Sequence, residues 1–398
     1  MRRVVYVCTD PGIPVFGSKG ASVHVRAVLR RLVAAGLEVD LITPRTGGDA
    51  PPDLAQVRVH LLPQVVGADP ADRERSAQAS EAGVAALLDT IADDGPIDLV
   101  YERYALWGRT SSAWAQRRGI RSILEVNAPL VHEHADHRGL VHRDGAEQVA
   151  RQAIGRAGAV VCVTESVARW ARSCTPTPER VQVIANGVDT HRITPSPAPP
   201  VPAATDPFTV GFVGTLKPWH GVDVLIDAMA LLIHTDPSYR LLVVGHGPQA
   251  AALAERARGR AITGAVEFTG AVDPDEIAAM LRRMAVATAP YPPMRDCYFS
   301  PLKVQEYLAA GVPVVASRIG VLPEVLDDGR LGELVAPGDP DELAGAIASL
   351  RADAGRRAQL RRDAVQAARA HDWDHVVRRA VGLVGLTLPV RRDDDALV

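Results

Sequence analysis

The sequence predicts an α/β protein made of two doubly wound, Rossmann-like domains that face a cleft. Short apolar, β-branched runs alternate with longer segments of helical periodicity, as is typical of a parallel sheet covered by helices. A proline-rich stretch at residues 194–207 interrupts this alternation, which then starts again. A length of 398 residues suits two or three domains, and we expect two of similar size.

The first domain is expected over residues 1–193 and opens with a βαβ unit. Residues 4–8 are all apolar, as in a buried parallel strand, and residues 21–35 place their apolar side chains on one helical face. Gly36 ends this helix before the next strand. The remaining strands of this domain are expected at residues 37–43, 98–101, 121–126, 159–163 and 181–184.

The linker, residues 194–207, contains six prolines in fourteen residues, which neither a helix nor a central strand accommodates. The second domain is expected over residues 208–370. Its strands are expected at residues 208–213, 239–244, 266–269, 285–289 and 312–316, and its helices include 222–234, 274–283 with Asp273 as N-cap, and 301–310.

Composition excludes several classes of protein. The 44 basic and 47 acidic residues give a net charge of −3, which argues against a nucleic-acid-binding protein. No pair of the four cysteines has CxxC spacing, which argues against a zinc ribbon or a redox motif. We find neither a signal peptide nor an apolar run long enough to span a membrane, so a cytoplasmic protein is expected. The composition also suggests a GC-rich bacterial genome.

The segment from Ser300 to Ser317 carries the strongest chemical signal. Ser300 is a suitable N-cap and Pro301 a suitable first residue for the helix, whose free amides and dipole favour a diphosphate. Lys303 lies in the first turn, where a cation suits a bound phosphate better than it suits the helix. Glu306, three residues on, could accept hydrogen bonds from a ribose diol. A capped helix with a Lys–Glu pair is the alternative interpretation.

A second segment follows the strand at residues 208–213. The strand ends at Gly214, where a backbone without a side chain allows a ligand to approach closely. The loop that follows carries Lys217, which can bind a phosphate as a point charge, and His220. A surface loop with a solvated lysine is the alternative interpretation.

These segments, in this order and spacing, resemble the retaining GT-B glycosyltransferases of family 4, which use nucleotide-sugar donors. The resemblance extends to the Gly20 loop and to residues 186–189, 245–248 and 268–270. It implies that the C-terminal domain binds a UDP- or GDP-linked sugar and that the N-terminal domain binds a hydroxyl acceptor. It also implies a metal-independent reaction without a cofactor, and a C-terminal segment at 371–398 whose helix, anchored by Trp373, packs back on the N-terminal domain.

Residue by residue, the resemblance places Glu306 at the donor ribose. It places the backbone from Phe299 to Leu302, which includes Ser300 and Pro301, near the sugar and diphosphate.

The chain departs from the family pattern at three positions. Thr215 and His220 stand where members carry an arginine and a lysine, so Lys217 and Lys303 are expected to supply the positive charge. Tyr298 stands at the family's first glutamate, which makes Asp296 the candidate to contact the sugar hydroxyls.

The N-terminal domain has its own candidates. Gly20 is expected near the donor phosphate and Asn127, at the end of a strand, near the reacting sugar. Arg103 and Glu133 are candidates to bind the acceptor. The histidine-rich stretch at residues 132–142 lacks a familiar metal-ligand spacing and is expected to form a polar loop on the acceptor side.

We therefore expect a retaining glycosyltransferase of natural-product or cell-surface glycan synthesis. Two alternatives remain open: a nucleotide-sugar epimerase or hydrolase, and a non-catalytic nucleotide-sugar-binding protein, against which Lys303 and Glu306 argue. The acceptor is a small molecule or a lipid-linked glycan. Arg26, Arg30 and Arg31 on the first helix are the feature that favours a peripheral membrane contact.

Overall fold

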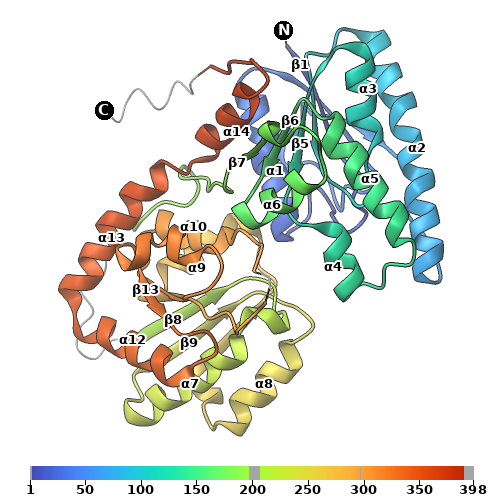
Figure 1. Cartoon of the computed structure of the whole chain (residues 1–398). Coiled ribbons are helices and arrows are strands. Elements are labelled where there is room, and N and C mark those ends of the chain that lie inside the picture. The colour runs from blue at the N-terminus through green and yellow to red at the C-terminus, as the bar shows by residue number, and fades with distance from the viewer. Residues whose placement is uncertain (1, 197–206, 296, 390–398) are drawn as a thin grey trace. The chain divides into compact units, whose positions relative to one another are not determined.

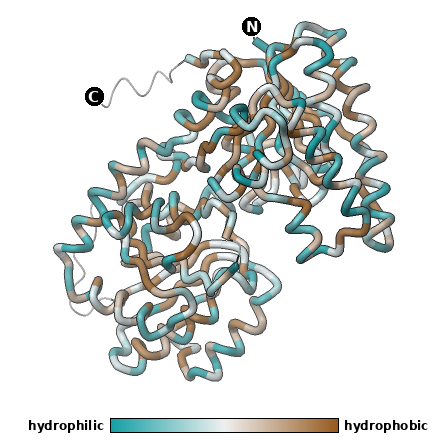
Figure 2. Tube along the Cα trace, in the orientation of Figure 1, coloured by the Kyte–Doolittle hydropathy of each residue, from teal (hydrophilic) through white to brown (hydrophobic). Residues whose placement is uncertain are grey.

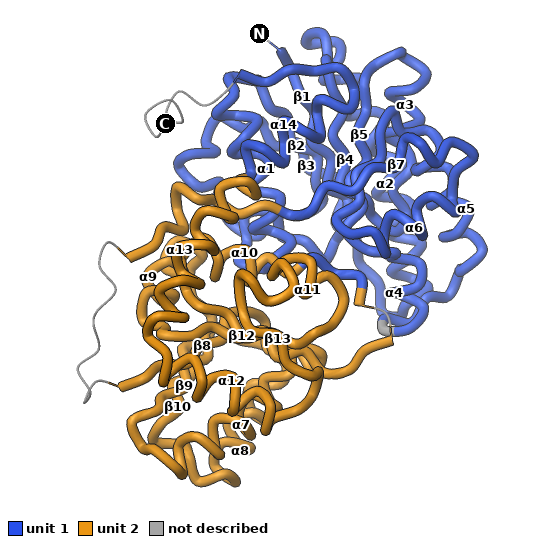
Figure 3. The backbone as a smooth tube through the Cα atoms, turned by 60° about the vertical axis from the view of Figure 1, so that its left-hand side comes forward, with its two compact units in different colours: residues 1–186, 298–300, 373–398 blue, residues 187–297, 301–372 orange. Residues whose placement is uncertain are grey.

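The computed structural model describes residues 2–196, 207–295 and 297–389. The chain forms two compact units (Figures 1 and 3). Unit 1 comprises residues 1–186, 298–300 and 373–398, and unit 2 comprises residues 187–297 and 301–372. Most of the proline-rich linker lies outside the described residues, as do Asp296 and the last nine residues of the chain.

The boundary between the units differs slightly from the expected one. Unit 1 ends at Asn186 rather than at residue 193. The residues after Asn186 are tied into unit 2, since the amide of Val188 donates to the carbonyl of His371 at 2.9 Å. In the same region, the amide of Thr190 donates to the carboxylate of Asp372 at 3.1 Å.

Unit 1 contains a seven-stranded sheet in which every pairing is parallel. The strand order is β3-β2-β1-β4-β5-β6-β7, so the direction of winding reverses between β1 and β4. The strands are β1 (Arg3–Cys8), β2 (Glu38–Thr43), β3 (Arg58–Leu61), β4 (Leu99–Arg103), β5 (Arg121–Val126), β6 (Ala159–Cys162) and β7 (Val181–Val183). The helices are α1 (Gly20–Ala34), α2 (Pro70–Asp94), α3 (Thr110–Arg118), α4 (Leu130–His137), α5 (Arg143–Arg156), α6 (Glu165–Ser173) and α14 (Trp373–Gly382).

Unit 2 repeats this architecture with a six-stranded parallel sheet. The strand order is β10-β9-β8-β11-β12-β13, and the winding reverses between β8 and β11. The strands are β8 (Phe208–Val213), β9 (Tyr239–Val244), β10 (Val266–Gly270), β11 (Val286–Ala289), β12 (Val314–Ser317) and β13 (Glu333–Val335). The helices are α7 (Val222–Thr235), α8 (Ala250–Gly259), α9 (Ile277–Arg282), α10 (Leu302–Ala309), α11 (Leu322–Val325), α12 (Pro340–Ala352) and α13 (Ala354–Arg369).

Each unit has its own apolar core beside its sheet, and Figure 2 shows hydrophobic stretches of chain inside both units. The predicted fold class, two doubly wound α/β domains, is confirmed. Two strands were not predicted. β3 lies at a sheet edge, where Val59 and Leu61 are exposed, and β13 has only three residues. In such sheets ligands bind beyond the carboxyl ends of the strands, near the point where the winding reverses.

Three local predictions are corrected. Pro301 has extended ψ, so it is the N-cap of α10 rather than its first residue, and Ser300 does not cap the helix. Residues 274–276 form a 3-10 turn ahead of α9, although Asp273 does cap that turn. The histidine-rich stretch is not a loop throughout, because Leu130–His137 is α4.

The basic residues of α1 do not form a free basic face. Arg26 and Arg31 are buried, and Arg31 contacts Asp374 of α14. Arg30 pairs with Asp53 at 2.5 Å. Among the described residues, no helix combines the length and apolar character needed to cross a bilayer.

Candidate functional site

The lysine at the start of α10 is buried without a partner. Lys303 is 9% exposed, and its ammonium nitrogen has no hydrogen-bond partner. The Nζ atom lies 4.0 Å from the ring centroid of Phe212 and 5.4 Å from that of Tyr291. Burial lowers the pKa of Lys303 to about 7, and nearby Glu306 opposes this shift. A buried ammonium that has no hydrogen-bond partner and lies beside two aromatic faces is a strong site for an incoming anion.

The helix that carries Lys303 is fixed by a tyrosine one turn further on. The hydroxyl of Tyr307 accepts a hydrogen bond from the amide of Val213 at 2.9 Å and donates to the carbonyl of Thr288 at 3.3 Å. These bonds attach α10 to the ends of β8 and β11. No side chain caps the N-terminus of α10, so its first amides remain open to a ligand.

A glycine loop borders this lysine, and a second glycine loop packs against the first. Gly214 has a φ of +147°, and a Cβ atom there would lie 3.0 Å from Lys303 Nζ. Gly245 has a φ of +137°, and a Cβ atom there would lie 2.0 Å from the carbonyl oxygen of Gly214. The two loops are also hydrogen bonded, since the amide of Leu216 donates to the carbonyl of His246 at 3.2 Å. The second loop can approach the first so closely only because residue 245 is glycine, whereas the glycine at 214 leaves room for the Lys303 ammonium.

His220 contributes a neutral ring to the same region. Burial, with Lys303 and Lys217 acting in the same direction, lowers the pKa of His220 to about 3. Its Nδ1 atom contacts the carbonyl oxygen of Thr215, so we assign the proton to Nδ1 and leave Nε2 as an acceptor. The side chain of Lys217 lies beside a different aromatic ring, with Nζ 5.4 Å from the centroid of Trp219.

Glu306 completes the predicted donor residues of unit 2. It is half-buried, and burial raises its pKa to about 7, while Lys303 opposes the rise. Among the described residues the two side chains form no ion pair. Each therefore carries a desolvation cost that a ligand with both an anion and hydroxyl donors would relieve.

In unit 1, the predicted residue Asn127 belongs to a buried network around Glu125. The carboxylate accepts hydrogen bonds from Tyr101 at 2.7 Å, Arg103 at 3.1 Å and Asn127 at 2.6 Å. His24 Nε2 lies 2.7 Å from the same group. Burial alone would raise the pKa of Glu125, but His24, Arg103 and Asn127 outweigh it and hold the pKa at about 2. The guanidinium of Arg103, a predicted acceptor-binding group, therefore forms an ion pair with the buried carboxylate of Glu125.

The candidate Glu133 is joined to the segment that precedes α10 in the sequence. Tyr298 donates its hydroxyl to Glu133 at 2.8 Å, and Arg138 pairs with the other oxygen at 2.6 Å. The backbone of this segment is held as well. Thr164 donates to the carbonyl of Tyr298 at 2.9 Å, and Asn186 donates to that of Ser300 at 3.3 Å.

The predicted residues thus fall into two groups. Unit 2 holds Gly214, Thr215, Lys217, His220, Pro301, Leu302, Lys303 and Glu306 at the carboxyl ends of its strands. Unit 1 holds Gly20, Arg103, Asn127, Glu133 and Ser300. Gly20 is the exposed first residue of α1, and Asp296 lies outside the described residues. The described residues contain no cluster of three or more metal-ligating side chains.

Sequence reasoning missed several residues of these groups. The rings of Phe212 and Tyr291 lie beside the Lys303 ammonium. In the sequence they look like ordinary residues of a strand and of a loop, so nothing there indicates this role. Glu125 could have been found, because a charged residue inside an apolar strand run is unusual and calls for a partner.

Comparison with known proteins identifies the chain as a glycosyltransferase. The profile described as "Glycosyl transferases group 1" matches residues 207–353, and the one described as "Glycosyltransferase Family 4" matches residues 18–192. The chain is 31% identical to the D-inositol 3-phosphate glycosyltransferase of Acidothermus cellulolyticus, over 98% of this chain and 92% of that protein. The chain therefore belongs to glycosyltransferase family 4.

Further comparisons agree with this assignment. The D-inositol 3-phosphate glycosyltransferase 2 of Catenulispora acidiphila is 30% identical over 89% of this chain and 87% of its own length. Among solved structures, sucrose-phosphate synthase from Thermosynechococcus elongatus has a TM-score of 0.72, with 21% identity over 96% of this chain and 98% of its own. HepE of Anabaena, in complex with UDP and glucose, has a TM-score of 0.70 and 18% identity over 97% of this chain and 100% of its own. These similarities confirm the GT-B fold.

Proposed function

We propose that the enzyme is a retaining glycosyltransferase that moves a sugar from a UDP-sugar to a hydroxyl acceptor. The observation that carries this proposal is the buried, unpartnered ammonium of Lys303 at the open N-terminus of α10. In this proposal, Lys303 and the first amides of α10 hold the diphosphate, and Glu306 accepts hydrogen bonds from the ribose. UDP is the preferred nucleotide because the similarly folded HepE was crystallised with UDP and with UDP-glucose.

The proposed reaction breaks the bond between the sugar's anomeric carbon and the diphosphate oxygen. The acceptor oxygen forms its new bond on the same face, and its proton passes to the departing diphosphate. The charge that develops on the leaving group is the one that Lys303 and the helix amides face, so they stabilise the transition state more than the ground state. We expect no metal ion or other cofactor in this step.

Our proposal for the acceptor names only a chemical class, whereas the donor is proposed to be a UDP-sugar. The relatives in Acidothermus and Catenulispora are named for D-inositol 3-phosphate, a polyol that carries a phosphate. We propose an acceptor that offers a hydroxyl group, to be identified by screening small phosphorylated polyols beside lipid-linked glycans.

The decisive experiment measures release of UDP from UDP-sugars with and without an acceptor pool. We expect release to depend on the acceptor. Lys303→Ala should lower turnover by about ten- to a thousandfold, the range for losing a group that stabilises transition-state charge. Lys217→Ala tests the second lysine predicted at the donor site, and we expect a smaller loss because its ammonium lies beside Trp219.

The other outcomes are equally informative. UDP release without acceptor would instead indicate hydrolysis or epimerisation, and binding without turnover would indicate a non-catalytic protein. Full activity in Lys303→Ala would contradict the proposal that Lys303 binds the diphosphate of the donor. Unchanged rates after treatment with a chelator are expected, and a chelator-sensitive rate would contradict the metal-independent step.

A further inference from the structure

Residues 298–300, which lead into α10, belong to unit 1, although the residues on both sides of them belong to unit 2. They form neither helix nor strand. Three side chains of unit 1 hold them, each from a different element. Glu133 of α4 accepts from the Tyr298 hydroxyl, Thr164 at the start of α6 donates to the Tyr298 carbonyl, and Asn186 after β7 donates to the Ser300 carbonyl. We call these three contacts the clamp.

The bond between Tyr298 and Glu133 is the strongest contact of the clamp. It is 2.8 Å long and joins a hydroxyl to a carboxylate, whereas Asn186 donates to a neutral carbonyl at 3.3 Å. Burial raises the pKa of Tyr298, and the Glu133 carboxylate raises it further, so the hydroxyl keeps its proton and donates. The other oxygen of the carboxylate accepts from Arg138 at 2.6 Å, which leaves the first oxygen to the hydroxyl.

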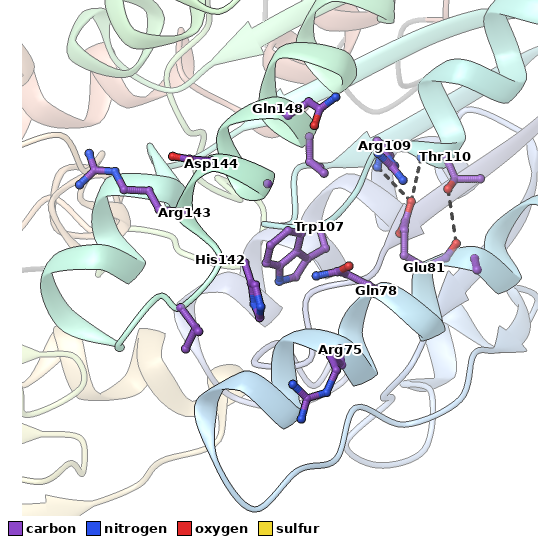
Figure 4. A pocket seen from close by; sticks show the side chains of 14 residues that line it. Arg75, Gln78, Glu81, Trp107, Arg109, Thr110, His142, Arg143, Asp144 and Gln148 are labelled. Atoms are coloured by element: carbon purple, nitrogen blue, oxygen red, sulfur yellow. Dashed lines mark hydrogen bonds between the residues drawn. The ribbon is translucent and has the colours of Figure 1, made fainter.

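The helix that carries Glu133 is itself anchored in unit 1. The turn that follows α4 is held by Glu74 of α2, which accepts from the amides of Val141 and His142 at 2.7 and 3.0 Å. Figure 4 shows His142 in the wall of a cavity of about 880 Å³, which no residue of the clamp lines. The clamp is therefore a separate feature, and it is attached to a helix whose far end is fixed.

The sequence that follows the clamp favours a different local structure. Ser300 and Pro301 suit the N-cap and the first residue of a helix, and a serine N-cap accepts from the second or third amide, here Leu302 or Lys303. In the structure these two amides have no hydrogen-bond partner among the described residues. Pro301 has φ −79° and ψ 99°, so the capped arrangement needs mainly a rotation of ψ to about −42°. That rotation would redirect residues 298–300, and every contact of the clamp opposes it.

We propose that Tyr298 is a positioning residue for the donor site. Its bond to Glu133 holds residues 298–300 against unit 1 and so prevents Ser300 from capping α10. The first amides of the helix therefore stay open. These are the amides that the proposed function assigns to the diphosphate, so the inference rests on that function. Tyr298 acts through the backbone of its segment, because its own hydroxyl is engaged by Glu133.

Calorimetric titration with UDP-glucose, without acceptor, measures the effect on the donor site. Tyr298→Phe removes only the hydroxyl and should weaken binding by about three- to tenfold, the scale of one hydrogen bond. Glu133→Ala should weaken it to a similar extent, and the double variant should lose no more than either single variant, because both changes remove the same bond. Glu133→Gln should retain part of the affinity, since its amide oxygen can still accept from the hydroxyl.

Tyr104→Phe is the matched control for the loss of a hydroxyl. The Tyr104 hydroxyl is also buried in unit 1, and it has no hydrogen-bond partner among the described residues. We expect this variant to bind UDP-glucose as the wild type does.

Two further measurements test the capping step itself. Hydrogen–deuterium exchange of the free protein, followed by mass spectrometry, should be slower at the amides of Leu302 and Lys303 in Tyr298→Phe than in the wild type, because Ser300 then accepts from one of them. The loss of affinity caused by Tyr298→Phe should also be smaller in a Ser300→Ala background, in which the serine cap cannot form.

Each measurement can overturn the proposal. It fails if Tyr298→Phe binds UDP-glucose like the wild type, or if Tyr104→Phe loses as much affinity. It also fails if exchange at the two amides does not become slower, or if the loss is as large in the Ser300→Ala background. A wild-type protein that does not bind UDP-glucose would contradict the proposed donor instead, and the exchange measurement, which needs no donor, would still decide whether the clamp prevents capping.

Discussion

At the scale of single residues, the candidate donor site is a balance between two opposite charges that are each unfavourable alone. Lys303 and Glu306 are three residues apart on α10, and burial shifts the pKa of each to about 7, one from above and one from below. At neutral pH the pair therefore exchanges readily between charged and neutral forms. The form that would suit a UDP-sugar is the one with Lys303 protonated and Glu306 ionised.

This balance predicts a bell-shaped dependence of donor affinity on pH. Below pH about 7 Glu306 becomes protonated and no longer accepts two ribose hydrogen bonds; above it Lys303 loses its charge and its attraction to the diphosphate. We expect UDP-glucose to bind best near pH 7 in calorimetric titrations, because its diphosphate diester does not itself titrate in this range. Glu306→Gln should remove the decline on the acidic side and leave the alkaline decline.

NMR titration of the lysine side chains measures the pKa of Lys303 directly. The sequence has only three lysines, Lys19, Lys217 and Lys303, so the spectrum of a protein with ¹³C-methylated lysines will be simple. One lysine should titrate near pH 7, and adding UDP-glucose should raise its pKa. A donor affinity that does not change with pH would contradict the predicted titration of Lys303 and Glu306 near neutral pH. Three lysines that all titrate near the ordinary value of about 10.4 would contradict it as well.

At the scale of elements, the site depends on two loops that approach each other at Gly214 and Gly245. The two glycines have similar φ values but face different neighbours. A side chain at 214 would meet the end of the flexible Lys303 side chain, whereas one at 245 would meet the backbone of Gly214. A flexible side chain can move aside, and a backbone held between two parallel strands cannot.

We therefore predict different consequences for alanine at the two positions. Gly214→Ala should fold, with a moderate loss of stability from its positive φ, but should displace the Lys303 ammonium and weaken UDP-glucose binding by about tenfold or more. Gly245→Ala should lower the stability of unit 2 markedly, because its Cβ would lie 2.0 Å from a carbonyl oxygen. Chemical denaturation and titration with UDP-glucose separate the two effects. Equal loss of stability in both variants would contradict this account.

The elements themselves were largely predictable from the sequence, and the reasons are local. The strands at 121–126, 208–213 and 239–244 were predicted with the bounds that the structure has, because each is a short run of mainly apolar residues, as is typical of buried parallel strands. The start of α10 was misplaced by one residue, since Ser-Pro is a good helix start on local grounds and the backbone of Ser300 is instead held by Asn186. Lys303 was predicted from its place in a first turn. Its burial was not, because it depends on Phe212, which lies far earlier in the chain, and on the path of the loop that carries Tyr291.

At the scale of the whole molecule, the chain leaves unit 1 and later returns to it. After Asp372 the chain rejoins unit 1 through α14, which packs against α1 at the other end of the sequence. Trp373 is 4% exposed and its ring centroid lies 4.7 Å from that of His24, while Asp374 pairs with Arg378 at 2.5 Å and contacts Arg31. Unit 1 is thus completed only when the whole of unit 2 has been synthesised.

This arrangement predicts that a substitution near the C-terminus destabilises the unit that contains the N-terminus. Trp373→Ala removes a large buried side chain and should lower the stability of unit 1 by about 3–5 kcal/mol. In differential scanning calorimetry we expect one transition to move to lower temperature while the other, identified by its rise on adding UDP-glucose, stays in place. Leu383→Ala, at an exposed position just beyond α14, is the matched control and should change neither transition. A shift of the donor-sensitive transition in Trp373→Ala, or of both transitions together, would show that α14 does not stabilise unit 1 alone.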